Sequence, residues 1–206
     1  MLLGYDPGQF SSIVVAQESS LFGRKELKVL KEHFIYYPKS HADLAEQFNV
    51  FWGEARKSRT IMLYYDRAGN QTLNTKKQLK MDAERLRKEL ERYGWQVILM
   101  NKNQRTIFHY EHYALCERLF GEEENNTPRV RIDENECPNS AIYLSPVTQR
   151  NGYIELDKTS ETKVPLQNQA GLTTQIPSAL LYLLFGLYEK WLPDGVNNIS
   201  YLPGSD

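Results

Sequence analysis

Two apolar segments of strand length, each ending in one aspartate, constrain the fold of this chain most. They are residues 2–6 and 61–66, and they end in Asp6 and Asp66. An apolar strand places its last residue at the edge of a sheet, where the core stops. If the two strands are neighbours, the two carboxylates face each other, and a divalent cation is the usual way to offset their repulsion. The pair therefore indicates magnesium- or manganese-dependent chemistry on phosphates. The alternative is that each aspartate starts a turn, because Asp-Pro-Gly and Asp-Arg-Ala-Gly are good turn sequences.

Size, charge and cysteine usage limit the classes of protein to consider. A chain of 206 residues indicates one domain, or one domain with an appendage. The net charge of −1 excludes a general polycation, so a nucleic-acid site must be a local patch. The two cysteines lack zinc-site spacing, and no signal peptide is evident, which favours a cytosolic protein with reduced thiols. The longest apolar run, residues 179–188, is too short to span a bilayer and predicts a buried helix.

The order of elements predicts a mixed α/β sheet flanked by helices. The first three strands follow one another directly and should form an antiparallel meander, whereas later strands arrive through helical crossovers and should be parallel to a neighbour. Residues 134–175 are polar and less regular, with one hairpin cue at Asn151-Gly152. The expected strands are 2–6, 12–17, 27–37, 60–66, 95–100 and 128–132. The expected helices are 41–56, with Ser40 as its N-cap, 74–93, 106–120 and 176–192.

Four segments carry a family resemblance: 3–8, 11–15, 62–70, and 154–163 followed by the helix 175–184. In order and spacing the chain resembles the C-terminal nuclease domain of tailed-phage terminase large subunits, which has a ribonuclease H-like fold. The resemblance implies one nuclease domain over 1–206, with 134–175 as an insertion before the last helix. It implies a domain that cuts concatemeric DNA during genome packaging in the host cytoplasm. The implied partners are double-stranded DNA, an ATPase motor domain, the portal and the small terminase subunit, with no membrane.

The resemblance also implies a metal site with Mg²⁺ or Mn²⁺ held by three acidic residues. The first two correspond to Asp6 and Asp66, and Asp6 is the expected bridging ligand because it ends the central strand. The third normally belongs to an Asp-Ala pair at the start of the last helix, where this chain has Ser178-Ala179. Serine is a poor, neutral metal ligand beside a carboxylate. Either the site is weakened or another carboxylate substitutes, and Asp157 is one candidate.

Several basic and polar residues after the second aspartate are candidates for DNA contact. Arg67 and Asn70 could contact a phosphate, although the favoured interpretation is that they are solvated loop residues without a function. The first turns of helix 74–93 are purely basic and could follow a DNA backbone, with Lys76, Lys77 and Lys80 as the candidates. The second half of that helix mixes charges and is typical of a solvated face with ion pairs. A second candidate patch is Lys102, Asn103, Gln104 and Arg105.

His109 and His112 lie on one face of helix 106–120, so they are candidate metal ligands. No third ligand is evident, and the helix is rich in apolar residues, so a packed helix with surface histidines is the favoured interpretation. Cys116 on the same helix is expected in the core.

Three other functions compete with an active nuclease. A catalytically impaired domain of the same fold could bind DNA or dock on packaging proteins, and the Ser178 position is the feature that separates it from an active nuclease. Actin-like sugar kinases and chaperone ATPases also begin with an Asp-x-Gly hairpin, but they need a second domain for which this chain is too short. Holliday-junction resolvases share the fold, but a fuller set of acids would be expected.

Overall fold

The computed structural model describes residues 1–8, 10–54, 58–66, 82–101, 107–121, 126–142, 147–150, 153–156, 163–168 and 173–192. The strands are β1 (Leu2–Asp6), β2 (Phe10–Leu21), β3 (Arg24–Tyr36), β4 (Thr60–Tyr65), β5 (Gln96–Leu99), β6 (Arg129–Ile132), β7 (Val147–Arg150) and β8 (Tyr153–Leu156). The helices are α1 (His41–Trp52), α2 (Asp82–Arg92), α3 (His109–Gly121), α4 (Pro138–Ile142) and α5 (Gln175–Tyr188), with short 3₁₀ turns η3 (Leu166–Asn168) and η4 (Glu189–Trp191). Within the described ranges no helix combines the length and apolar character needed to cross a membrane.

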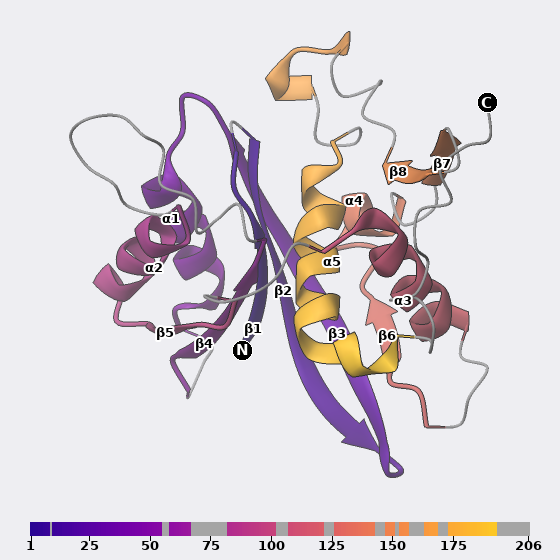
Figure 1. The fold of residues 1–206 in the computed structure, drawn as a ribbon. Coiled ribbons are helices and arrows are strands. Elements are labelled where there is room, and N and C mark those ends of the chain that lie inside the picture. Colours follow the sequence, from indigo (N-terminus) through magenta and orange to yellow (C-terminus); the bar gives the residue numbers. More distant parts are fainter. Residues whose placement is uncertain are drawn as a thin grey trace.

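Six strands form one mixed sheet in the order β5-β4-β1-β2-β3-β6 (Figure 1). β1, β2 and β3 pair antiparallel as a meander, and β4 is parallel to β1, β5 to β4 and β6 to β3. β1 therefore lies inside the sheet with β4 on one side and β2 on the other, as expected from the sequence. This strand order and these directions, with helices on both faces, confirm a ribonuclease H-like fold.

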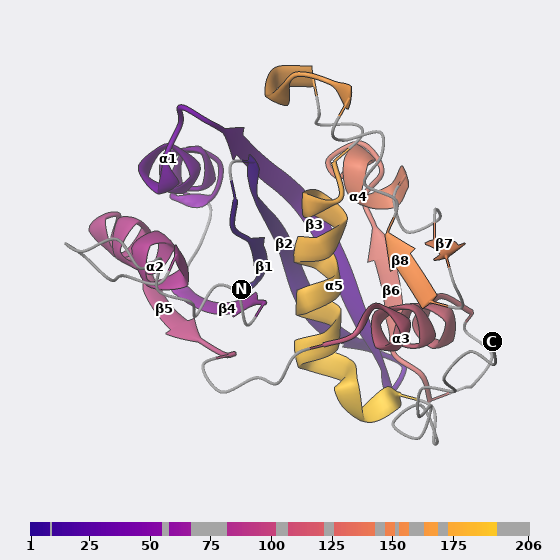
Figure 2. The same ribbon diagram turned by 45° about the horizontal axis from the view of Figure 1, so that its top comes forward.

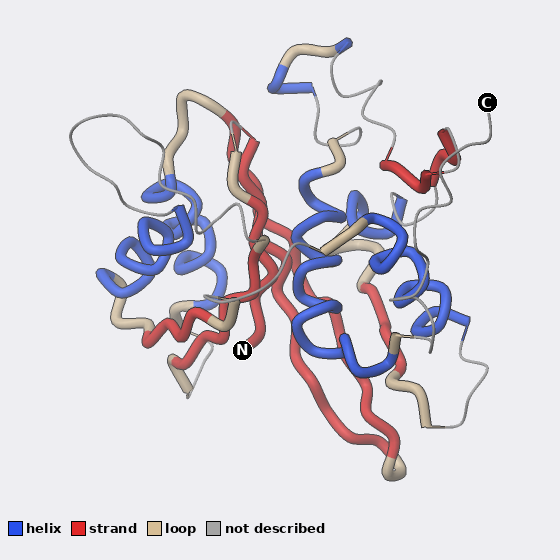
Figure 3. Tube along the Cα trace, viewed as in Figure 1, coloured by secondary structure: helices blue, strands red, loops and turns tan. Residues whose placement is uncertain are grey.

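Each face of the sheet carries its own apolar core because side chains alternate along every strand. In β1, Leu3 and Tyr5 belong to the cluster under α1 and α2, whereas Leu2 belongs to the cluster under α5. Figures 2 and 3 show the two helix groups on opposite sides of the strands, with α5 lying along the middle of its face. The buried helix expected over 179–188 is this α5, and its side chains Ala179, Leu180, Leu183, Leu184 and Phe185 are fully buried.

The second and third strands extend beyond the predicted ranges. The predicted strands 12–17 and 27–37 are observed as 10–21 and 24–36, joined by a tight turn at Phe22 and Gly23, which both have positive φ. Residues 17–21 are exposed and mostly polar, so they lack the apolar signal on which the prediction depended. Backbone pairing with β3 along the whole hairpin holds them in the strand conformation.

Helix ends follow local capping chemistry. Ser40 precedes α1 as predicted, and the Asp43 carboxylate accepts hydrogen bonds from the Ser40 backbone N–H at 2.7 Å and from its hydroxyl at 2.9 Å. The prediction that this helix reaches about residue 56 was wrong, because α1 ends at Trp52. After α2, Gly94 has φ of +79° and ends the helix as predicted.

The described part of the predicted helix 74–93 is α2, and residues 74–81 lie outside the described residues. Ion pairs join Arg87 to Glu84 and Glu91, and Arg92 to Glu89, along its outer face. These pairs confirm the interpretation of the second half of this helix as a solvated, mixed-charge face.

The polar segment 134–175 contains more regular structure than its composition indicated. α4 lies within it, and β7 and β8 pair antiparallel with Arg150 opposite Tyr153, which confirms the hairpin predicted from Asn151-Gly152, although those two residues lie outside the described ones. Just before this segment, β6 pairs with β3 as the sixth strand of the main sheet. A single domain over 1–206 stays a prediction.

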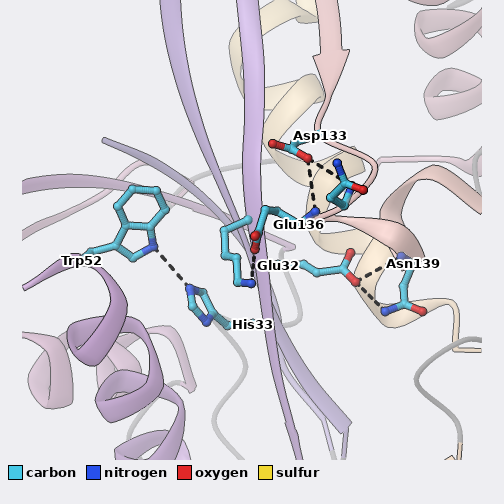
Figure 4. A network of polar contacts seen from close by, with 8 residues as sticks. Glu32, His33, Trp52, Asp133, Glu136 and Asn139 are labelled. Carbon is cyan, nitrogen blue, oxygen red and sulfur yellow. Dashed lines mark hydrogen bonds and ion pairs between the residues drawn. The ribbon is translucent and has the colours of Figure 1, made fainter. Parts of the chain in front are cut away.

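A buried glutamate on β3 fixes α4 against the sheet (Figure 4). The Glu32 carboxylate accepts hydrogen bonds from the backbone N–H of Asn139 at 3.1 Å and of Ser140 at 2.9 Å, and from the Ser140 hydroxyl at 2.8 Å. The Asn139 side-chain amide donates to the same carboxylate. One carboxylate therefore satisfies the first turn of α4, as an acidic cap does at a helix N-terminus.

Replacing Glu32 by glutamine is expected to lower the free energy of unfolding by about 2 kcal/mol, because a donating amide replaces one accepting oxygen among buried donors. Urea denaturation followed by circular dichroism measures this change. The matched control is Glu136→Gln, which breaks the half-exposed ion pair with Lys31 and should cost less than about 1 kcal/mol. Equal losses in the two variants would contradict the capping role of Glu32.

Candidate metal centre

The two aspartates identified in the sequence end adjacent strands on the same face of the sheet. Tyr5 and Tyr65 are partners in the parallel pairing of β1 and β4, so Asp6 and Asp66 follow side by side. Both tyrosines belong to the cluster under α1 and α2. Because side chains alternate, each aspartate, one residue later, faces the opposite side, toward α5. Both aspartates are partly exposed.

α5 crosses this face in close contact with both strands. A Cβ atom added to Gly4 of β1 would lie 2.0 Å from the carbonyl oxygen of Ala179, and one added to Gly186 would lie 2.2 Å from the Tyr64 ring of β4. Glycine at these two positions permits the close approach of helix and sheet. The Ser12 hydroxyl of β2 donates to the carbonyl oxygen of Gln175 at 2.9 Å, which fixes the first residue of α5.

Tyr182 on α5 interacts electrostatically with both acids. Burial raises its pKa first, and the charges of Asp6 and Asp66 raise it further, while the Ser178 side chain acts in the opposite direction. The ring also packs edge-on against His112, with ring centroids 5.8 Å apart. Tyr182 therefore keeps its proton at neutral pH, beside both carboxylates.

Ser178, at the position expected for the third acid, has a structural hydrogen bond instead. Its side chain is buried, and its hydroxyl donates to the carbonyl oxygen of Thr174 at 2.7 Å. Within the described ranges, no group of three or more His, Cys, Asp or Glu side chains is arranged to hold a metal ion. Asp157, the candidate substitute, lies outside the described residues.

A neutral oxygen, that of the Gln175 side-chain amide, lies at the N-terminal end of α5, close in sequence to Ser178. Gln175 Oε1 is buried and has no hydrogen-bond partner. It lies against Gly8, two residues after Asp6, where an added Cβ would be 2.8 Å from this oxygen. Carboxylate and amide oxygens are the donors that hard divalent cations prefer. Asp6, Asp66 and Gln175 therefore have the donor chemistry for a magnesium or manganese ion.

Gly8 lies in the turn that joins β1 to β2, as its sequence indicated, and it has a second role beside α5. Positive φ among the described glycines occurs at Gly23 and Gly94, and Gly8 has no such conformation. The turn is held by Ser11, whose hydroxyl donates to the Gly8 carbonyl oxygen at 2.8 Å. The missing side chain at Gly8 also leaves room for Gln175.

The structure brings Asp6 and Asp66 together, and their roles as metal ligands stay predictions. The remaining candidates for nucleic-acid contact lie outside the described residues. They are Arg67, Asn70, Lys76, Lys77 and Lys80, and the second patch Lys102, Asn103, Gln104 and Arg105.

The expectation of surface histidines on α3 was wrong for His112. That side chain is buried, between the rings of Tyr182 and Phe185. The side chain of His109 lies outside the described ones. Cys116 packs against the same core as expected, and burial raises the pKa of its thiol to about 12.

Sequence reasoning missed Gln175 and Tyr182 as members of this site. Together with Ser178 they occupy positions i, i+3 and i+7 of α5, which share one face of a helix. The rest of that face and the flanking positions are apolar, so three polar residues at this spacing were the available signal.

Comparisons with known proteins add one structural likeness. No family model matches the chain, and no curated protein matches it in sequence. Among solved structures, RuvC from Thermus thermophilus is similar, with 10% sequence identity and a TM-score of 0.35, over 92% of this chain and 95% of that chain. The fold class of this chain rests on its own strand order and strand directions.

Proposed function

We propose that this chain is a divalent-metal-dependent endodeoxyribonuclease. One observation carries the proposal: Asp6 and Asp66 end neighbouring parallel strands and face the same helix, where Tyr182 experiences both charges. Two carboxylates held this way at the edge of a buried sheet repel each other unless a cation lies between them. Hydrolysis of a phosphodiester is a reaction that a divalent cation at such a pair would assist.

The residues of the chain have separable roles in this chemistry. A divalent cation held by Asp6 and Asp66 would stabilise charge on the phosphate and lower the pKa of a bound water. Asp6, from the strand inside the sheet, and Asp66, from its neighbour, are the anionic ligands. Tyr182 retains its proton and can donate a hydrogen bond to a carboxylate or to a phosphate oxygen at the rim of the site.

The biological setting that we propose is DNA packaging by a tailed phage. The support is the resemblance of segments 3–8, 11–15 and 62–70 to the nuclease domain of terminase large subunits, together with the fold. In that setting the substrate is concatemeric double-stranded DNA, and the partners are an ATPase motor domain, the portal and the small terminase subunit. A site that contacts phosphates selects little sequence.

Nicking of supercoiled plasmid tests the activity. The wild-type chain is expected to convert supercoiled DNA to nicked and linear forms with Mn²⁺ or Mg²⁺ and to leave it intact with EDTA. Ser178→Asp supplies the acid absent from this position and is expected to raise the rate at low metal concentration by about tenfold, because a third carboxylate tightens metal binding. Cleavage that persists in EDTA would contradict the proposal.

A catalytically impaired DNA-binding or docking domain is the second candidate. The observation that favours it is Ser178, whose hydroxyl is engaged with Thr174 inside α5 instead of offering a carboxylate to the acid pair. In this case the wild-type chain would retard plasmid DNA in a gel without cutting it at any metal concentration. Cleavage gained only in Ser178→Asp would identify the missing acid as the cause.

A further inference from the structure

α5 is an apolar helix with one polar stripe, which begins beside the loop that follows Asp6. The stripe consists of Gln175, Ser178 and Tyr182, at successive positions of one helix face. Gln175 and Tyr182 are partly exposed residues, but Ser178 is buried and the Gln175 Oε1 atom is inaccessible to solvent, so exposure does not explain that oxygen. A buried oxygen without a hydrogen-bond partner, close to the end of the strand that carries Asp6, indicates a polar ligand between helix and sheet.

Two members of the stripe are unsuited to hold a cation. The Ser178 hydroxyl already donates within the helix, to Thr174. The Tyr182 hydroxyl is a phenol, which is not among the carboxylate, amide, backbone carbonyl and water oxygens that hard divalent cations prefer. Gln175 is the member with an oxygen that has no partner.

The contacts that fix the position of Gln175 do not involve its Oε1 atom. Its backbone carbonyl accepts the Ser12 hydroxyl at 2.9 Å, and its backbone N–H donates to Thr173 Oγ1 at 3.2 Å. Its side chain lies against Gly8, on the loop that continues from Asp6, in space that any side chain at position 8 would occupy. A buried amide oxygen with no donor costs free energy, and a ligand that contacts it recovers that cost.

We propose that Gln175 Oε1 is the third protein ligand of a single divalent cation held by Asp6 and Asp66, in place of the acid that Ser178 does not supply. The inference rests on the proposed function, because it uses the same acid pair. Two carboxylates and a neutral amide balance the charge of one divalent cation, whereas a second cation would leave an excess of positive charge. The site therefore selects one cation from the hard, oxygen-preferring class.

Calorimetric titration of the purified chain with MnCl₂ tests this inference without any cleavage assay. The wild-type chain is expected to bind one Mn²⁺. Gln175→Met keeps the length of the side chain, removes the oxygen and is expected to weaken binding by about tenfold or more. Gln175→Glu adds a carboxylate at the same place and is expected to tighten it. The matched control is Gln47→Met, a partly exposed glutamine on α1 across the sheet, which should bind Mn²⁺ as the wild type does.

Thermal melting in EDTA gives a second readout, in which Gln175→Met is expected to gain stability although it loses Mn²⁺ affinity. Gln175→Met removes a buried oxygen without a partner and is expected to raise the melting temperature of the metal-free chain by about 2–4 °C. A structural role for the amide would lower it instead. Higher metal-free stability combined with weaker Mn²⁺ binding supports the assignment.

The outcomes separate this inference from the proposed function. Mn²⁺ binding that is lost in Asp6→Asn but unchanged in both Gln175 variants would overturn the role of Gln175 and leave the acid pair intact. Absence of Mn²⁺ binding by the wild-type chain would overturn both. If Gln175→Met does not fold, unchanged affinity in Gln175→Glu is sufficient to reject the inference. Loss of binding in Asp157→Asn with normal binding in Gln175→Met would assign the third ligand to Asp157.

Discussion

Asp6→Asn is expected to reduce metal-dependent nicking by about a thousandfold or more, because loss of an anionic ligand removes several kcal/mol of charge stabilisation. Asp6 stands on β1, between β2 and β4, whereas Asp66 directly follows β4. We therefore expect the loss in Asp6→Asn to exceed that in Asp66→Asn. Initial nicking rates over a range of Mn²⁺ concentrations measure both variants, and circular dichroism verifies that each one is folded.

The matched control for Asp6→Asn is Asp43→Asn, the same chemical change on the opposite side of the sheet. Asp43 caps α1, so its replacement should cost about 1 kcal/mol of stability and leave the nicking rate unchanged. Nicking that survives in Asp6→Asn at the wild-type rate would place the metal elsewhere or assign the activity to a contaminant.

The position of the acid pair could be predicted from the sequence because it depends on short-range rules. A run such as Leu2–Asp6 is apolar on both faces, so it predicts a strand buried on both sides that ends where the polar residue begins. Helical crossovers before β4 and β5 required parallel neighbours, and the observed pairing agrees. Alternation along the strands then determines that Asp6 and Asp66 share one face.

The helical side of the site could not be predicted in the same way. α5 is apolar over most of its circumference, so its hydrophobic pattern does not specify which face meets β1. Its rotation is set by contacts between residues far apart in the chain, such as Ser12 with Gln175, 163 residues later. These contacts place Gln175 and Tyr182 near the acids. They also bring Gln175 against Gly8, where the missing side chain leaves room for it.

Elements with weak apolar signals were the other source of error. The end of the β2–β3 hairpin is polar and exposed, and its conformation comes from backbone pairing, which residue patterns report poorly. His112 was expected at the surface, but aromatic neighbours from α5 bury it. In both cases tertiary contacts override the local preference of the residues.

Gly4→Ala is expected to lower the free energy of unfolding by about 3 kcal/mol or more, the largest stability loss that we predict for a single methyl group. The added Cβ would lie 2.0 Å from the Ala179 carbonyl oxygen and 3.0 Å from Leu183 Cβ. The first of these is helix backbone, so rotation of a side chain cannot relieve the overlap. The helix must move away from β1, and that movement opens the core that Leu180 and Leu184 help to fill.

Urea denaturation measures this loss, and Gly23→Ala is its matched control. Gly23 has φ of +80° with no atom within 4 Å of an added Cβ, so its replacement costs backbone strain of about 1 kcal/mol without any overlap. A Gly4→Ala protein as stable as Gly23→Ala would contradict the close seating of α5 on β1. Because α5 also carries Gln175 and Tyr182, any Gly4→Ala protein that still folds should bind Mn²⁺ more weakly than the wild type, whereas Gly23→Ala should bind it normally. A shared loss of stability and metal affinity in Gly4→Ala alone would link the packing of this helix to the geometry of the acid pair.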